Sequence, residues 1–357
     1  MKKLNVLQSW RAFFILMVCI EHMALSGPIS YLAGGGEGVS FFIVLSGFLT
    51  GYIYTDWITD YSFEAQKQFT LKKIKKFYPL HILSLLGALL LNVLIVVKNQ
   101  GFPIEEIMAL LGKTVLNATF LQVYIPVKSI YMNNINGVVW FLSTIVFCYA
   151  NSIWAIKLIR KVTKKYLLFI GACIFHTFII EMFRTSEARS YVLYVFPLFR
   201  FLEYFMGILA GYYFLHKKEK KPDFVRMSIV ELLTVGLFVA CHILLKMSYL
   251  EQWGNLQYYT MFWSSIILVV VFANQEGMVS KILNQPLLVY IGNISFEIYI
   301  IHQVIIKYVT TALGWGNLAA VVSGGFIITG AAILHKYAND VFKNIAEKSN
   351  NKNINTN

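Results

Sequence analysis

Charged residues are scarce in this chain of 357 residues. Asp, Glu, Lys and Arg make up 14% of it and apolar residues 57%, and the mean hydropathy is +0.62. Soluble domains carry about 25% charged and roughly 45–50% apolar residues. Because one water-soluble core cannot bury so much apolar surface, we expect a lipid bilayer to be the solvent of this protein.

Cysteine is also rare, and no two of the four cysteines form a Cys-x-x-Cys pair. All four lie inside apolar runs, so we predict buried free thiols, with neither disulfides nor a metal site. The net charge is +13, but the basic residues form short clusters between apolar runs, and no nucleic-acid-binding motif is present. We therefore predict no binding to nucleic acid.

Ten apolar stretches are long enough for membrane-spanning helices, which need roughly 20 residues. An eleventh, near 104–125, is interrupted by Glu105, Glu106 and Lys113. We predict an all-α polytopic transmembrane bundle of about ten helices, in which 104–125 is an outer re-entrant or interfacial segment. The expected spans lie near 8–26, 37–55, 77–97, 137–159, 166–183, 193–215, 228–247, 258–274, 287–307 and 316–335.

The basic residues predict the orientation of the helices. With ten spans and both termini inside, the inner segments contain 21 Lys and Arg and the outer segments five, as expected if the inner side is cytoplasmic. A spanning helix at 104–125 would move later basic clusters outside. We expect a multi-pass cell-membrane protein with cytoplasmic termini, a membrane domain at 1–340 and a disordered cytoplasmic tail at 341–357.

Arg11 and His22 lie within the first apolar stretch, where ionisable side chains are costly. Eleven residues at about 100° each place both side chains on one helical face, about 16 Å apart along the axis. We expect Arg11 near the inner surface, where it can bind phosphate, and His22 near the outer surface, where it can move a proton. Alternatively, Arg11 extends to the interface and His22 is a packed, hydrogen-bonded residue.

A basic loop is expected at the inner surface, before the third span. It either attracts anionic membrane lipid or forms a second phosphate clamp. Its four lysines are Lys72, Lys73, Lys75 and Lys76.

Polar residues also recur at helical spacing later in the chain. Arg200 and Glu203 are three residues apart and can form an ion pair, for which a structural role is the more common one. Ser295, Tyr299 and His302 follow an i, i+4, i+7 pattern, which predicts a polar stripe facing the bundle interior.

The second span contains Gly47 and Gly51, whose spacing lets another helix or a ligand approach the backbone closely. Glu37, at the outer end of this span, is positioned either to pair with His22 or to face water.

Six segments of the chain, in this order, resemble those of the acyltransferase type 3 family. The first helix of that family carries an arginine, ten further residues and a histidine, as Arg11 and His22 do here. The other segments contain the Ser-Gly-Phe, Tyr-Pro, Trp-x-Leu-Ser, Arg-Phe-x-Glu and Tyr-x-x-His motifs. The six segments are Trp10–His22, Gly38–Phe48, Lys72–Pro79, Trp140–Ser143, Arg200–Gly207 and Ile294–His302.

The chain departs from the family pattern at three points. One extra residue precedes Ser46, and lysines replace the usual arginines in the basic loop. Thr144–Val146 stands where many members have acidic residues, so this chain offers no acid there.

This resemblance implies a membrane-bound O-acyltransferase. The reaction would move an acetyl or other short acyl group from cytoplasmic acyl-CoA to a hydroxyl of a sugar or cell-surface glycan. His22 would be the general base, and a direct transfer needs no bound cofactor, metal or covalent enzyme intermediate. Arg11 and the four lysines would hold the CoA phosphates. Tyr299, His302 or Ser143 would stabilise the oxyanion. The candidates for binding substrate are these three together with Ser46, Trp140, Arg200 and Glu203.

Three other classes of membrane protein compete with this interpretation. A transporter or flippase for a glycan intermediate would have an inverted repeat and broken helices, neither of which is visible in the sequence. A polysaccharide polymerase usually carries large outer loops. A structural scaffold would not need the pair formed by Arg11 and His22.

Overall fold

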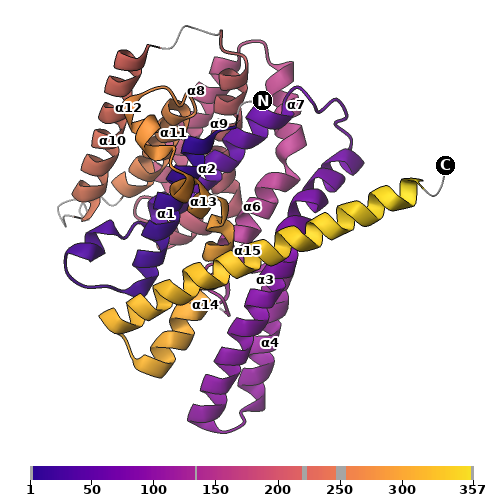
Figure 1. Cartoon of the computed structure of the whole chain (residues 1–357), viewed down its shortest axis with the longest axis vertical. Coiled ribbons are helices and arrows are strands. Elements are labelled where there is room, and N and C mark those ends of the chain that lie inside the picture. Colours follow the sequence, from indigo (N-terminus) through magenta and orange to yellow (C-terminus); the bar gives the residue numbers. More distant parts are fainter. Residues whose placement is uncertain (1–2, 133–134, 219–222, 247–254, 355–357) are drawn as a thin grey trace.

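The computed structural model describes residues 3–132, 135–218, 223–246 and 255–354, and this described part is helical without a strand. Seven helices are long and apolar enough to cross a membrane, or up to nine if each of two bent pairs is one span. Figure 1 shows them as a bundle in which the N-terminus and the start of α3 lie at the same end. The predicted all-α polytopic membrane fold is confirmed.

Each predicted span contains an apolar helix, although α11 has only 17 residues, and the last residue of 228–247 lies outside the described part. Eight of the predicted spans correspond to single helices: α1 (Asn5–Met23), α2 (Gly35–Tyr54), α3 (Phe63–Gln100), α8 (Lys165–Met182), α9 (Pro197–Leu215), α10 (Phe224–Lys246), α11 (Leu256–Phe272) and α15 (Asn317–Ile354). The bent pairs are α6 (Trp140–Ala150) with α7 (Ser152–Lys161), and α13 (Pro286–Asn293) with α14 (Ser295–Leu313).

These bends correct the expectation of unbroken helices at 137–159 and 287–307. The axis turns by 43° between α6 and α7 and by 64° between α13 and α14. At the first bend, Asn151 Nδ2 donates to the Phe147 carbonyl at 2.8 Å, a local hydrogen bond that competes with the helical pattern. At the second, Gly292 and Asn293 are residue types that commonly end helices.

Helix α3 is longer than predicted, and it includes the lysines that were expected in a loop. It begins where the Ser62 hydroxyl accepts a hydrogen bond from the Ala65 N–H at 3.1 Å. Lys, Gln and Glu favour helix, so the polar segment stays helical. Its 38 residues rise about 57 Å, well beyond the roughly 30 Å of a bilayer core.

Helix α4 (Ile104–Ala118) runs beside α3 (Figure 1). Its 15 residues rise about 22 Å, too little to cross a bilayer, in agreement with the prediction that this segment does not span. The remaining elements are short: η1 (Pro28–Leu32), η2 (Gln122–Tyr124), α5 (Lys128–Tyr131), η3 (Tyr191–Val195) and α12 (Met278–Leu283).

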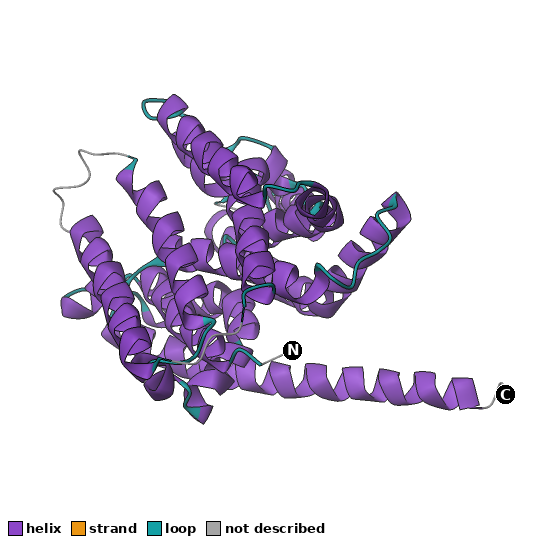
Figure 2. Ribbon diagram, turned by 90° about the horizontal axis from the view of Figure 1, so that it is seen from above, coloured by secondary structure: helices purple, strands orange, loops and turns teal. Residues whose placement is uncertain are grey.

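At the C-terminal end, α15 projects away from the bundle (Figure 2). It continues to Ile354, into the tail 341–357 for which the sequence predicts disorder. That disorder stays a prediction.

Helices α2 and α9 pack backbone against backbone. A Cβ atom on Gly47 would overlap the Tyr204 carbonyl, and one on Gly207 would overlap the Val44 carbonyl. Gly51 and Gly211 make equivalent contacts with the facing helix. The glycine spacing in the second span therefore serves the approach of another helix.

We expect Gly207→Ala to lower the free energy of unfolding by about 1–3 kcal/mol, because overpacking at a close contact forces the helices apart. Thermal melting of the detergent-purified protein measures this loss. Gly236→Ala is the matched control, since no atom lies within 4 Å of a Cβ at that position. Equal melting temperatures for the two variants would contradict the close contact.

Candidate active site

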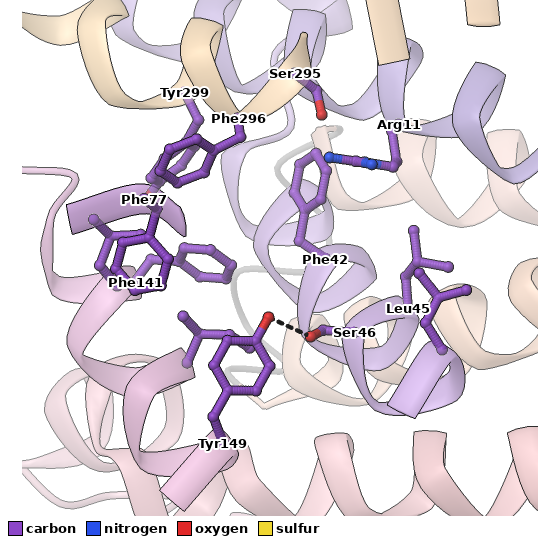
Figure 3. A pocket seen from close by; sticks show the side chains of 13 residues that line it. Arg11, Phe42, Leu45, Ser46, Phe77, Phe141, Tyr149, Ser295, Phe296 and Tyr299 are labelled. Atoms are coloured by element: carbon purple, nitrogen blue, oxygen red, sulfur yellow. Dashed lines mark hydrogen bonds between the residues drawn. The ribbon is translucent and has the colours of Figure 1, made fainter. Parts of the chain in front are cut away.

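A narrow cavity of about 230 Å³ lies between α1, α2, α3, α6 and α14 (Figure 3). Eight of the thirteen residues that line it are apolar, among them Phe42, Phe77 and Phe141. The polar ones come from four different helices and are Arg11, Ser46, Tyr149, Ser295 and Tyr299. The cavity can therefore hold a slender, mostly apolar ligand that has a few polar groups.

The Arg11 side chain points into this cavity and lies near Ser295 and Phe42 (Figure 3). Its Nη1 donates to Gln8 Oε1 at 2.7 Å, so a residue three positions earlier on the same helix holds it. The buried Ser295 hydroxyl has no hydrogen-bond partner among the described residues. Arg11 and Ser295 thus offer donors to a ligand.

On the opposite wall, Ser46 Oγ and Tyr149 Oη are 3.0 Å apart. The Tyr149 ring also lies 5.5 Å from Lys73 Nζ, which is 4.5 Å from the Tyr54 ring. These cation–π contacts hold Lys73 beside the cavity, and it is half-buried. The other three lysines of the basic segment, Lys72, Lys75 and Lys76, are exposed.

His22 lies in the last turn of α1 and does not line the cavity. Its Nδ1 is 2.9 Å from the Val18 carbonyl and 3.4 Å from Nε2 of the buried His302. Tyr299 connects the two regions, because its ring lines the cavity and lies 5.7 Å from the His302 ring. The histidine pair is therefore next to the cavity and outside its lining.

The three residues considered for the oxyanion differ in their free donors. The Tyr299 hydroxyl donates to the Val138 carbonyl at 2.6 Å, and His302 Nδ1 donates to the Tyr299 carbonyl at 2.6 Å. The buried Ser143 hydroxyl has no partner in the described part of the chain, but Ser143 does not line the cavity. None of the three therefore offers a free donor to the cavity.

Arg200 and Glu203 form a buried cluster away from the cavity. Arg200 Nη1 donates to Glu203 Oε1 at 2.8 Å, and Nη2 donates to Ser40 Oγ at 3.0 Å. His176 Nε2 is 3.8 Å from the same carboxylate oxygen. Trp140 does not line the cavity either; its ring centroid is 4.9 Å from that of Tyr194, and Arg200 Cζ lies 5.9 Å from the same Tyr194 ring.

Two further buried carboxylates have histidine partners. Glu37 Oε1 is 2.8 Å from His242 Nδ1, which corrects the suggestion that Glu37 pairs with His22 or faces water. Glu297 Oε1 is 2.6 Å from His335 Nδ1. Among the described residues, no group of three or more His, Cys, Asp or Glu could hold a metal ion.

The fold and the cavity define a helical membrane protein with a cavity of small-molecule size between its helices. The chain matches the family model of an acyltransferase domain over residues 5–336. It therefore belongs to this acyltransferase family and is an enzyme, as the six segments predicted. No curated protein and no solved structure matches the chain.

Arg200→Met should cost about 3–5 kcal/mol of stability, because it leaves the Glu203 carboxylate buried without its cation. The double variant Arg200→Met/Glu203→Gln removes both charges and should recover most of that loss. Thermal melting in detergent compares the two. A double variant that melts as early as the single one would show that the ion pair is not the cause.

Proposed function

We propose that this acyltransferase moves an acetyl or other short acyl group from acyl-CoA to a hydroxyl of a sugar or cell-surface glycan. The observation that carries the proposal is the set of residues that lie along the cavity. The cavity contains Arg11, lies beside the half-buried Lys73 and reaches Tyr299, next to the histidine pair. Cationic side chains at and beside the cavity, together with a histidine pair next to Tyr299, suit a donor with phosphates at one end and a thioester at the other.

The shape of the cavity supports acyl-CoA as the donor. A volume of about 230 Å³ with mainly apolar walls suits the slender pantetheine arm and leaves the nucleotide outside. Lys73 and Arg11 would contact the CoA phosphates, and the three exposed lysines would raise the local concentration of the anionic donor. The free Ser295 hydroxyl would bond to an amide or thioester carbonyl of the arm.

In the transfer step, His22 Nε2 takes the proton of the acceptor hydroxyl while that oxygen attacks the thioester carbon. The new C–O bond forms and the C–S bond breaks, and the CoA thiolate leaves and takes up a proton. General-base assistance of this kind is typically worth about 10²–10⁴-fold in rate. With both termini in the cytoplasm, the donor would enter from inside and the acceptor would meet His22 from the outer side.

The two bent spans are a feature that we expected of a transporter rather than of an enzyme. The bend before α14 has a role in acyl transfer as well, because it lies directly before Ser295 at the cavity. Membership of an acyltransferase family favours the enzymatic interpretation.

His22→Ala should lower the acyl-transfer rate by about 10²–10⁴-fold without lowering the amount of folded protein. Membrane vesicles are given isotopically labelled acetyl-CoA and the glycan fraction of cells that lack the gene, and ester-linked label is counted. Mass analysis of glycans from cells with and without the gene locates the acyl group. Unchanged glycans would refute the acceptor class, and full activity of His22→Ala would refute the base.

Lys73→Gln should raise the KM for acetyl-CoA about tenfold, the effect of losing one charge-assisted hydrogen bond to phosphate. Lys75→Gln is the matched control from the same helix, and its KM should stay within about twofold because Lys75 is exposed. The same vesicle assay at varied donor concentration gives both constants. Equal effects of the two substitutions would mean that the aromatic contacts of Lys73 do not matter for the donor.

A further inference from the structure

Two histidines from distant parts of the chain meet beside the cavity, next to Tyr299. Nε2 of His302 lies 3.4 Å from Nδ1 of His22, and the ring centroids are 5.0 Å apart at an interplanar angle of 71°. His302 is fully buried, whereas His22 is half-buried. One ring is therefore fixed by the protein interior and the other is open to a ligand.

The hydrogen-bond partners assign the hydrogen in each ring. A backbone carbonyl only accepts hydrogen bonds. Nδ1 of His302 faces the Tyr299 carbonyl at 2.6 Å, and Nδ1 of His22 faces the Val18 carbonyl at 2.9 Å. Each Nδ1 therefore carries a hydrogen. A second hydrogen, on His302 Nε2, would point at the N–H of His22. The Nε2 atom of His302 therefore presents its lone pair to His22 instead.

This assignment leaves Nε2 of His22 as the basic nitrogen, and it has no hydrogen-bond partner among the described residues. The Val18 carbonyl belongs to α1 itself and holds the ring along that helix. His302 comes from α14, a second direction, so the two acceptors together fix the plane of the ring. A base is commonly oriented in this way by a third group.

We infer that His302 is a positioning residue that acts through His22. This inference rests on the proposed function, in which His22 is the general base. The lone pair of His302 holds the His22 ring with Nε2 toward the acceptor hydroxyl. When Nε2 takes the proton, the Nδ1–H of the charged ring still donates to that lone pair, which stabilises the charge.

Two amide substitutions separate this role from packing. A glutamine amide oxygen reaches the position of His302 Nε2, whereas an asparagine amide reaches only the position of Nδ1. His302→Gln should therefore keep the acyl-transfer rate within about fivefold, and His302→Asn should lose about 10- to 100-fold, the usual effect of removing a group that orients a functional side chain. The KM for acetyl-CoA should stay unchanged in both variants.

The experiment uses the full-length protein in vesicles with labelled acetyl-CoA and the glycan fraction of cells that lack the gene, alongside His22→Ala and His22→Ala/His302→Asn. Residues that act as one unit are not additive, so the double variant should be no slower than His22→Ala alone. A loss that multiplies, a fully active His302→Asn, or equal losses for Asn and Gln would each overturn the positioning role. An active His22→Ala would overturn the proposed base and this inference together.

Discussion

The backbone contact between α2 and α9 determines where the polar residues of the bundle interior can meet. Because glycines on both helices replace side chains, neighbouring hydroxyl groups come within bonding distance of each other. Tyr204 Oη lies 2.9 Å from Thr50 Oγ1 and 2.8 Å from Ser152 Oγ. Arg200 reaches Ser40 across the same interface. In a medium without water, such partners are what make buried polar groups tolerable.

A second close contact serves the cavity directly. Gly292, near the end of α13, lies against the backbone carbonyl of Gln8, where a Cβ atom would overlap it. Gln8 in turn holds the Arg11 guanidinium. The bend that follows Gly292 then aims α14 so that Ser295 and Tyr299 line the cavity. The close backbone contact at Gln8 and the cavity-lining Arg11 are thus only three residues apart on α1.

The sequence predicted the features that depend on a single helix. Apolar length identified the helices of the bundle, and helical periodicity placed Ser295, Tyr299 and His302 along one buried stripe. Pairs between distant segments were not predictable, because Glu37 and His242 are 205 residues apart and periodicity carries no information between helices. Tyr149 was missed because an aromatic residue in a span has no distinctive pattern. Gln8 could have been found from its i, i+3 spacing to Arg11.

His22 and His302 are separated by 280 positions along the chain. His22 belongs to α1 and His302 to α14. Their contact cannot exist while the polypeptide is still being synthesised, since translation must first pass residue 302 and α14 must dock beside α1. A nascent or prematurely terminated chain that stops before residue 302 can insert most of the described helices and still have no paired imidazoles.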